Sequence, residues 1–137
     1  VLCHARELEA ARAADAVEQG YLPVEWDHPM PMRTIEAEHD VFGDGRLTLL
    51  PLPGHTPGTI GALVTLDRDG AFLLAADAMP LRENLERELL PRNTWNPEAA
   101  GRSLQEILRL QRSGATVVFG HDAAQWAELR KGPDAYV

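Results

Sequence analysis

Short apolar runs bounded by glycine, proline and aspartate predict a series of β-strands along the chain. The segments with this pattern are residues 34–42, 46–53, 59–66, 71–77 and 115–122. Tight turns at residues 43–45 and 67–70 would join the first four segments into two hairpins. The last segment is apolar along its strand-forming part, so it predicts a strand that is buried on both faces.

Helical spacing of apolar residues marks two longer segments. The first helix is expected over residues 4–20, where Gly20 would end it. Its apolar face would consist of Leu8, Ala11, Ala14 and Val17. Residues 96–114 predict the clearest helix, because Asn96 can cap its beginning and Gly114 can close it.

The remaining segments predict shorter elements. Residues 82–89 indicate one or two helical turns, and residues 123–129 indicate a last short helix with Asp122 as its cap. Residues 21–32 contain three prolines and predict a connecting loop. The order of strands and helices, without internal repeats, indicates an α/β fold.

Composition and charge limit the class of protein. At 137 residues, with 45% apolar and 25% charged residues, the chain predicts one globular domain over residues 1–137. The net charge of −8 argues against nucleic acid or an anionic membrane as the main partner. No run reaches the roughly 20 apolar residues of a membrane span. A single cysteine, Cys3, and the lack of a signal peptide favour the cytoplasm.

Three of the predicted strands end in a residue that can bind a metal ion. Residues 46–53 lead to His55, residues 71–76 lead to Asp77, and the last strand leads to His121. If these strands point the same way in one sheet, their C-terminal ends bring the three side chains to one edge, where ligand sites of α/β folds are common. Imidazole and carboxylate groups are suitable ligands for zinc or iron.

Each of the three residues also has an ordinary structural explanation. His55 can be a loop histidine that is hydrogen-bonded to its own turn. Asp77 can cap the segment that follows it, which is the commoner role of such an aspartate. His121 can be a partly buried histidine that donates to a carbonyl. The metal hypothesis therefore depends on the recurrence at three strand ends and not on any one residue.

Three motifs in this order, "PLPGHTPGTIG", "LLAADA" and "VVFGHD", resemble the later metal-binding motifs of the metallo-β-lactamase fold superfamily. The ending "FGHD" and the segments "ARELEAAR", "DAMPLREN" and "WNPEAAGRSLQEILRL" resemble in particular its N-acyl-homoserine lactonase branch. The resemblance covers nearly the whole chain. It implies an αβ/βα sandwich, represented by its C-terminal portion with a mixed sheet and flanking helices.

The resemblance also implies a site and a reaction. His55 would belong to a first metal ion, Asp77 would bridge two ions, and His121 would belong to the second. The implied cofactor is zinc, two ions in the complete protein, with iron or another divalent metal as alternatives. The implied reaction is hydrolysis of a small-molecule ester or lactone, in which metal-activated hydroxide attacks the carbonyl. No catalytic residue beyond the metal ligands is identified.

The chain departs from the family pattern in two places. The superfamily's His-x-His-x-Asp-His motif is absent, and His4, His28 and His39 lack its spacing, so no functional role is expected for them. Because this motif is absent, and the chain begins at Val1 and not at Met, a partial domain is expected. Such a domain would cover its exposed sheet face by forming a homo-oligomer or by pairing with a missing N-terminal half. Lactonases of this branch carry a lactone-contacting tyrosine three residues after the bridging aspartate. Here that substrate-binding position is Pro80, which argues against homoserine lactone as the substrate.

Two other functions stay open at this point. The missing histidine cluster favours a catalytically incomplete half-domain that acts as an interaction module. The same ligand types also fit an iron-binding redox member of the fold.

Overall fold

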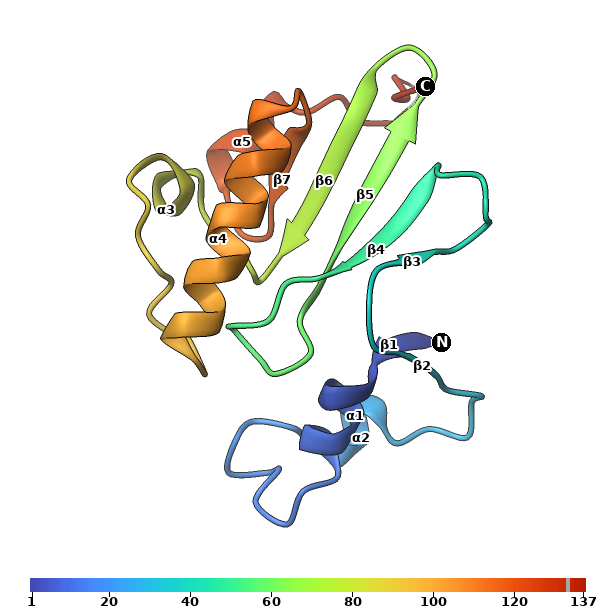
Figure 1. Cartoon of the computed structure of the whole chain (residues 1–137), viewed down its shortest axis with the longest axis vertical. Helices are drawn as coiled ribbons and strands as arrows, with labels where there is room; N and C mark the ends of the chain where they lie inside the picture. Colours follow the sequence, from blue (N-terminus) through green and yellow to red (C-terminus); the bar gives the residue numbers. More distant parts are fainter. Residues whose placement is uncertain (133) are drawn as a thin grey trace.

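A five-stranded mixed sheet lies at the centre of the computed structural model, which describes residues 1–132 and 134–137 (Figure 1). In spatial order its strands are β3 (His39–Asp40), β4 (Leu47–Pro51), β5 (Ile60–Leu66), β6 (Gly70–Ala76) and β7 (Thr116–Phe119). Strands β3 to β6 are successively antiparallel, whereas β7 is parallel to β6. Because two antiparallel steps separate β4 from β6, the strands β4, β6 and β7 all run in the same direction.

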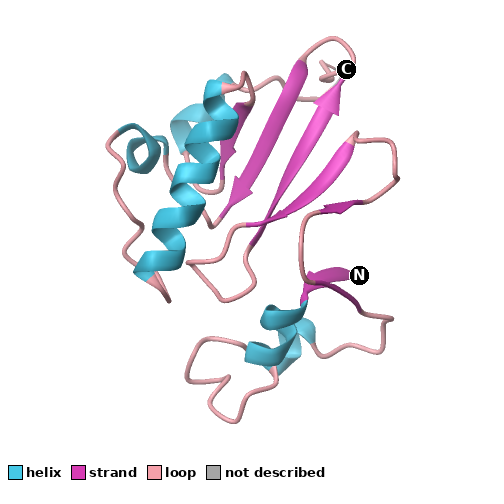
Figure 2. Cartoon of the chain, in the orientation of Figure 1, coloured by secondary structure: helices cyan, strands magenta, loops and turns pink. Residues whose placement is uncertain are grey.

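Three helices accompany the sheet: α3 (Arg82–Glu86), α4 (Pro97–Arg112) and α5 (Ala123–Glu128) (Figure 2). Helix α4 packs against β6 and β7 and supplies one side of the hydrophobic core. The largest fully buried side chains are Leu52, Leu73, Met79, Leu85 and Ile107. Among the described helices, none has the length and apolar composition needed to cross a membrane.

A smaller unit at the N-terminus lies beyond one end of the central sheet (Figure 1). In this unit β1 (Leu2–His4) pairs in parallel with β2 (Arg33–Ile35), and α1 (Ala5–Ala11) packs on the pair. The segment between them contains one helical turn, α2 (Pro23–Trp26). This arrangement brings α1 next to the loop that follows β4.

The elements with local sequence signals form as predicted. Strands β5 and β6 make the expected hairpin, and β3 and β4 make another. The side chain of Asn96 caps α4 by accepting the backbone N–H of Ala99 at 2.9 Å. Asp122 caps α5 in the same way, with the N–H of Gln125 at 2.8 Å, and α3 is the expected short helix.

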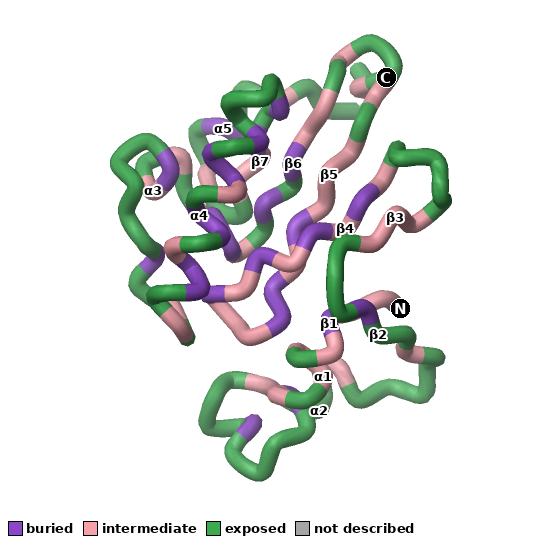
Figure 3. The backbone as a smooth tube through the Cα atoms, viewed as in Figure 1, coloured by how far each residue is buried: buried purple, intermediate pink, exposed green. Residues whose placement is uncertain are grey.

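The helix predicted over residues 4–20 is wrong beyond its first half. Helix α1 ends at Ala11, and the chain continues in turns that leave Ala14 exposed and Val17 59% exposed. Figure 3 shows how much of the chain between α1 and β2 is exposed. Helical spacing of apolar residues does not by itself stabilise a helix in water. It needs a partner surface for the apolar face, and Val17 has none among the described residues.

Three strand and loop predictions also need correction. Residues 34–42 do not form one strand, because their first part pairs with β1 as β2 and their last part pairs with β4 as β3. The predicted loop over residues 21–32 contains the turn of helix α2. Strand β7 is not buried on both faces. It lies at the edge of the sheet, with Thr116 exposed and Val117 buried.

The sheet face opposite α4 is also apolar. One row across it consists of Leu49, Ala62, Leu74 and Val118, which are register partners on four strands. Leu74 is 44% exposed, whereas its neighbour Leu73, on the helix-covered face, is fully buried. The sheet therefore has one covered face and one face that is only partly covered.

Helix α4 packs very closely on the loop after β4 through Gly54. Its φ is +148°, and a Cβ atom there would lie 2.5 Å from Cα of Ala100. We expect Gly54→Ala to lower the free energy of unfolding by about 2–4 kcal/mol, because overpacking and backbone strain act together.

Gly101, the next residue of α4, is the matched control, since a Cβ atom there meets nothing within 4 Å. Gly101→Ala should raise stability by up to about 1 kcal/mol, because alanine favours helix. Urea unfolding of both variants measures the difference. Equal stabilities would contradict the close packing at Gly54.

Candidate metal centre

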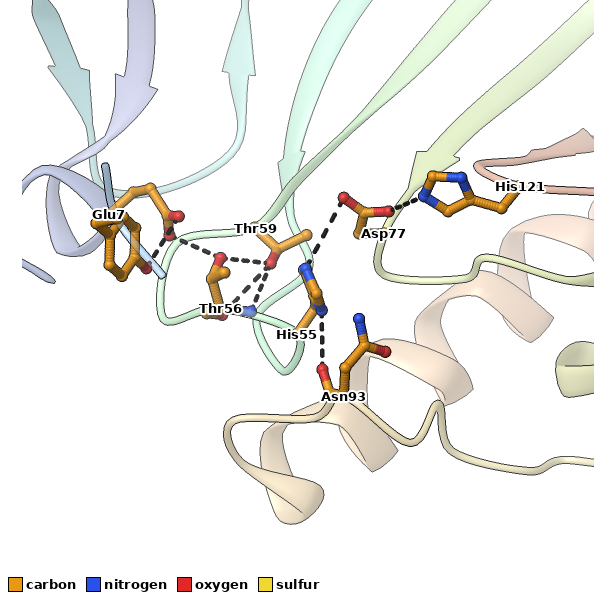
Figure 4. Close-up of polar contacts among 8 residues, drawn as sticks. Glu7, His55, Thr56, Thr59, Asp77, Asn93 and His121 are labelled. Carbon is orange, nitrogen blue, oxygen red and sulfur yellow. Dashed lines mark hydrogen bonds and ion pairs between the residues drawn. The ribbon is translucent and has the colours of Figure 1, made fainter. Parts of the chain in front are cut away.

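Three side chains meet where β4, β6 and β7 end. His55, Asp77 and His121 come from the loops that follow these three strands (Figure 4). Nε2 of His121 lies 2.7 Å from Oδ1 of Asp77, and Nε2 of His55 lies 3.8 Å from Oδ2 of the same carboxylate. The structure therefore brings the three predicted residues together, with Asp77 between the two imidazole rings.

A backbone carbonyl accepts a proton from one nitrogen of the His55 ring. Nδ1 of His55 lies 2.8 Å from the carbonyl oxygen of Asn93. Because a carbonyl only accepts, Nδ1 carries a proton, so in the neutral ring the lone pair belongs to Nε2, the nitrogen on the side of Asp77. At 3.8 Å this contact is too long for a hydrogen bond. A lone pair on the side of a carboxylate is an arrangement a cation would stabilise.

The loop of His55 is held from the side of α4 by main-chain and hydroxyl contacts. The Ser103 hydroxyl donates to the carbonyl of Pro53 at 2.7 Å. The N–H of Asn96 donates to the carbonyl of Gly54 at 3.1 Å, and the N–H of Trp95 donates to that of His55 at 3.3 Å. The backbone of His55 and of the two residues before it is thus tied to α4 and to the residues that precede this helix.

The strand end before Asp77 has an unusual backbone. Ala76 has a φ of +47°, and the pairing of β6 with β7 shifts register between Leu74 and Ala76. A left-handed conformation at a residue other than glycine costs on the order of 1–3 kcal/mol and is frequent at functional sites. This irregularity turns the chain out of the strand just where Asp77 begins the next loop.

His121 is placed mainly through its backbone. Its N–H donates to the carbonyl of Pro80 at 2.8 Å. Gly120 permits this approach, since a Cβ atom there would lie 2.6 Å from the carbonyl oxygen of Ala76. The His121 side chain is 69% exposed and reaches Asp77 at its far end. Pro80, the predicted substrate contact, therefore lies directly beside His121.

The donor set fits part of a metal centre. Two imidazoles and a carboxylate are zinc ligands, and the hydrogen bond of His55 Nδ1 to a carbonyl is the usual second contact of a metal-binding histidine. In the described part of the chain, however, no group of three or more His, Cys, Asp or Glu side chains is arranged to hold an ion by itself. The two histidines contact different oxygens of Asp77, so they do not surround a common point.

The other histidines have structural surroundings. His4 is buried and accepts the N–H of Arg6 at the start of α1, His39 lies in β3, and His28 is exposed in a loop. The sequence contains no local signal for the carbonyl of Asn93, which lies 38 residues from His55. The sequence also contains no local signal for the contact of Glu7, whose carboxylate accepts hydrogen bonds from the loop after His55.

Known proteins resemble this chain in sequence and in structure. The N-acyl homoserine lactonase AttM of Azorhizobium caulinodans is 34% identical over 85% of this chain and 47% of its own length. The chain therefore spans about half the length of the curated relatives that it matches. No family model matches the chain.

A solved N-acyl homoserine lactone hydrolase with the product N-hexanoyl-L-homoserine at its catalytic metal centre superposes with a TM-score of 0.83. It is 28% identical, and the match covers 97% of this chain and 51% of that protein. AbOPH, a hydrolase of the β-lactamase superfamily, gives a TM-score of 0.68 at 13% identity, over 89% of this chain and 47% of its own. These likenesses establish the fold.

The hydroxyl of Ser103 stabilises the loop that carries His55. Ser103→Ala would leave the carbonyl of Pro53 without its donor in a largely buried position, at a cost of about 1–3 kcal/mol. We expect a lower unfolding midpoint in urea and a looser loop at His55. The control is Ser113→Ala, which removes a similar bond to Leu110 at the exposed end of the same helix. That change should cost at most about 0.5 kcal/mol, so equal costs would contradict the role of Ser103.

Proposed function

We propose that the chain is part of a metal-dependent hydrolase of esters or lactones. It is homologous to about half of an N-acyl homoserine lactonase and has the metallo-β-lactamase fold. The observation that carries this proposal is the meeting of His55, Asp77 and His121 at one sheet edge. The carbonyl of Asn93 holds a proton on Nδ1 of His55, which leaves Nε2, on the side of Asp77, as the nitrogen available to an ion.

The residues of the chain take distinct roles in this proposal. His55 would contribute Nε2 to one ion and His121 would contribute Nε2 to another, while Asp77 would offer one oxygen to each. Divalent ions of this kind, with zinc as the proposed identity, lower the pKa of water and polarise a carbonyl oxygen. The carbonyl of Asn93 keeps the His55 ring in the tautomer that binds metal. His121 must give up the proton it now shares with Asp77.

We also propose that residues 1–137 form a partial domain. Its length relative to the matched lactonases supports this, as does the partly uncovered apolar sheet face with Leu74. Pairing with a further half, or with another copy of the chain, would bury that face and add ligands to the two ions. Three ligands for two ions leave each ion weakly held, so the chain alone is expected to bind metal weakly and to be a poor hydrolase.

The proposed substrate is a small ester or lactone. The matched hydrolase binds N-hexanoyl-L-homoserine, the product of lactone opening. Pro80 has no hydroxyl to offer a lactone, and it lines an open groove of about 550 Å³ with Leu81 and Leu89. Glu83, Asn84, Arg92 and Asn93 line the same groove, which therefore offers both apolar surface and polar groups to an ester or lactone.

The metal proposal predicts which side chains control zinc affinity. In calorimetric titrations of the 137-residue chain, His55→Ala, Asp77→Asn and His121→Ala should each weaken zinc binding at least about tenfold. His28→Ala serves as control, since His28 is exposed in a distant loop. If all four variants bind zinc equally, the three residues are not the ligands.

The substrate proposal predicts an order of reactivity. With zinc present, we expect the complete protein, in which this chain is joined to its missing half, to hydrolyse aryl esters and simple lactones faster than homoserine lactones, and all of these faster than β-lactams. Asp77→Asn should abolish the difference between substrates by removing the metal-dependent rate. Fastest turnover of the β-lactam would contradict the proposed substrate class.

A further inference from the structure

The carboxylate of Glu7 connects helix α1 to the loop of His55 across 49 to 51 residues of sequence (Figure 4). Its Oε2 accepts the Thr56 hydroxyl at 2.7 Å and the N–H of Gly58 at 2.8 Å. Its Oε1 accepts the Tyr21 hydroxyl at 3.1 Å. Glu7 thus makes two bonds to the segment that directly follows His55.

The carboxylate also sets the direction of the hydroxyl bonds behind it. Because a carboxylate only accepts, Thr56 must donate its hydroxyl proton to Glu7. The oxygen of Thr56 then accepts the proton of Thr59, at 2.7 Å. The Thr59 oxygen in turn accepts the backbone N–H of Thr56 at 2.9 Å. The Thr59 hydroxyl also lies 3.4 Å from the carbonyl oxygen of Thr56, so several bonds close the turn behind Glu7.

Two further features fit the contact between α1 and the loop. Gly58 lies so close to the helix that a Cβ atom would be 2.5 Å from the backbone nitrogen of Glu7. Burial, and then the charge of Glu7, raise the pKa of Tyr21 to about 12, so its phenol stays a donor at neutral pH. Tyr21 consequently holds the second oxygen of the carboxylate in place.

We propose that Glu7 is a positioning residue of the candidate metal centre, which fixes His55 by holding residues 56–58 from the side opposite to α4. The proposal rests on the metal-dependent function proposed above. The loop is tied to α4 through Pro53, Gly54 and His55, all on the N-terminal side of its turn or at the histidine itself. On the C-terminal side, Glu7 adds a restraint from α1 to the backbone bonds that Gly54 and Leu52 donate to Thr56 and Thr59. Its loss therefore gives the imidazole more freedom to rotate away from Asp77.

The test compares variants of Glu7 with a matched variant of the same helix. Glu7→Ala removes the carboxylate, whereas Glu9→Ala makes the same change at an exposed position of α1. Glu7→Gln is the conservative variant, because its amide oxygen can still accept from Thr56 and Gly58 while its NH₂ group donates to Tyr21. Thr56→Val and Thr56→Ser provide a second pair that alters the same bond without touching α1.

Two readouts without metal are measured on the 137-residue chain by NMR: hydrogen exchange of the Gly58 amide and the nitrogen shifts of the His55 ring. Glu7→Ala and Thr56→Val should speed exchange at Gly58 about tenfold or more. They should also move the His55 ring away from the pure Nδ1–H tautomer. Glu7→Gln, Thr56→Ser and Glu9→Ala should stay close to the parent chain. Zinc titration should show weaker binding in the same two variants.

The outcomes separate this proposal from the metal function. If Glu7→Ala folds and leaves both the Gly58 exchange and the His55 ring signals like those of Glu9→Ala, the positioning role is wrong. If Glu7→Ala does not fold, the two Thr56 variants decide, and identical behaviour of both overturns the proposal. If His55→Ala, Asp77→Asn and His121→Ala leave zinc binding unchanged but the ring signals still respond to Glu7, the metal function fails and the positioning of His55 stands.

Discussion

The common direction of β4, β6 and β7 is the constraint on which the candidate site depends. Side chains separated by 22 and 44 residues meet only because each follows the C-terminal end of a strand that points to the same edge. Reversing one strand would carry its ligand to the opposite edge, about 15 Å or more away for strands of this length. The antiparallel hairpin of β5 and β6 returns the chain, and the crossover through α4 allows β7 to lie parallel to β6.

The ends of the strands fix where the three side chains lie, and the loops that follow the strands fix how these side chains are oriented. Prolines and close glycine contacts limit the loop after β4, and hydrogen bonds from α4 on one side and Glu7 on the other remove its remaining freedom. Each such bond contributes only about 1 kcal/mol to stability. Their value for a metal site lies in geometry, since an imidazole that can rotate binds an ion less tightly than one already turned towards it.

The sequence predicted those features that depend on neighbouring residues. The hairpin of β5 and β6, the cap of α4 by Asn96 and the three strand-end ligands all have signals within a few positions. The pairing of β1 with β2 and the bond from Glu7 to Thr56 join distant segments and leave no such signal. Helix α1 illustrates the same limit. The helical spacing of apolar residues continues to Val17, but no neighbouring surface among the described residues buries Val17, and the helix ends at Ala11.

The main-chain placement of His121 does not depend on the side chain at position 80. The bond that holds the N–H of His121 goes to the carbonyl of residue 80, which every amino acid supplies. A tyrosine and a proline at this position can therefore place the histidine equally well, while only the tyrosine offers a phenol to a lactone. Proline loses no bond here, because only its carbonyl takes part. The side chain at position 80 is thus free to vary without moving His121, so the proposed substrate contact and the proposed metal ligand beside it can change independently.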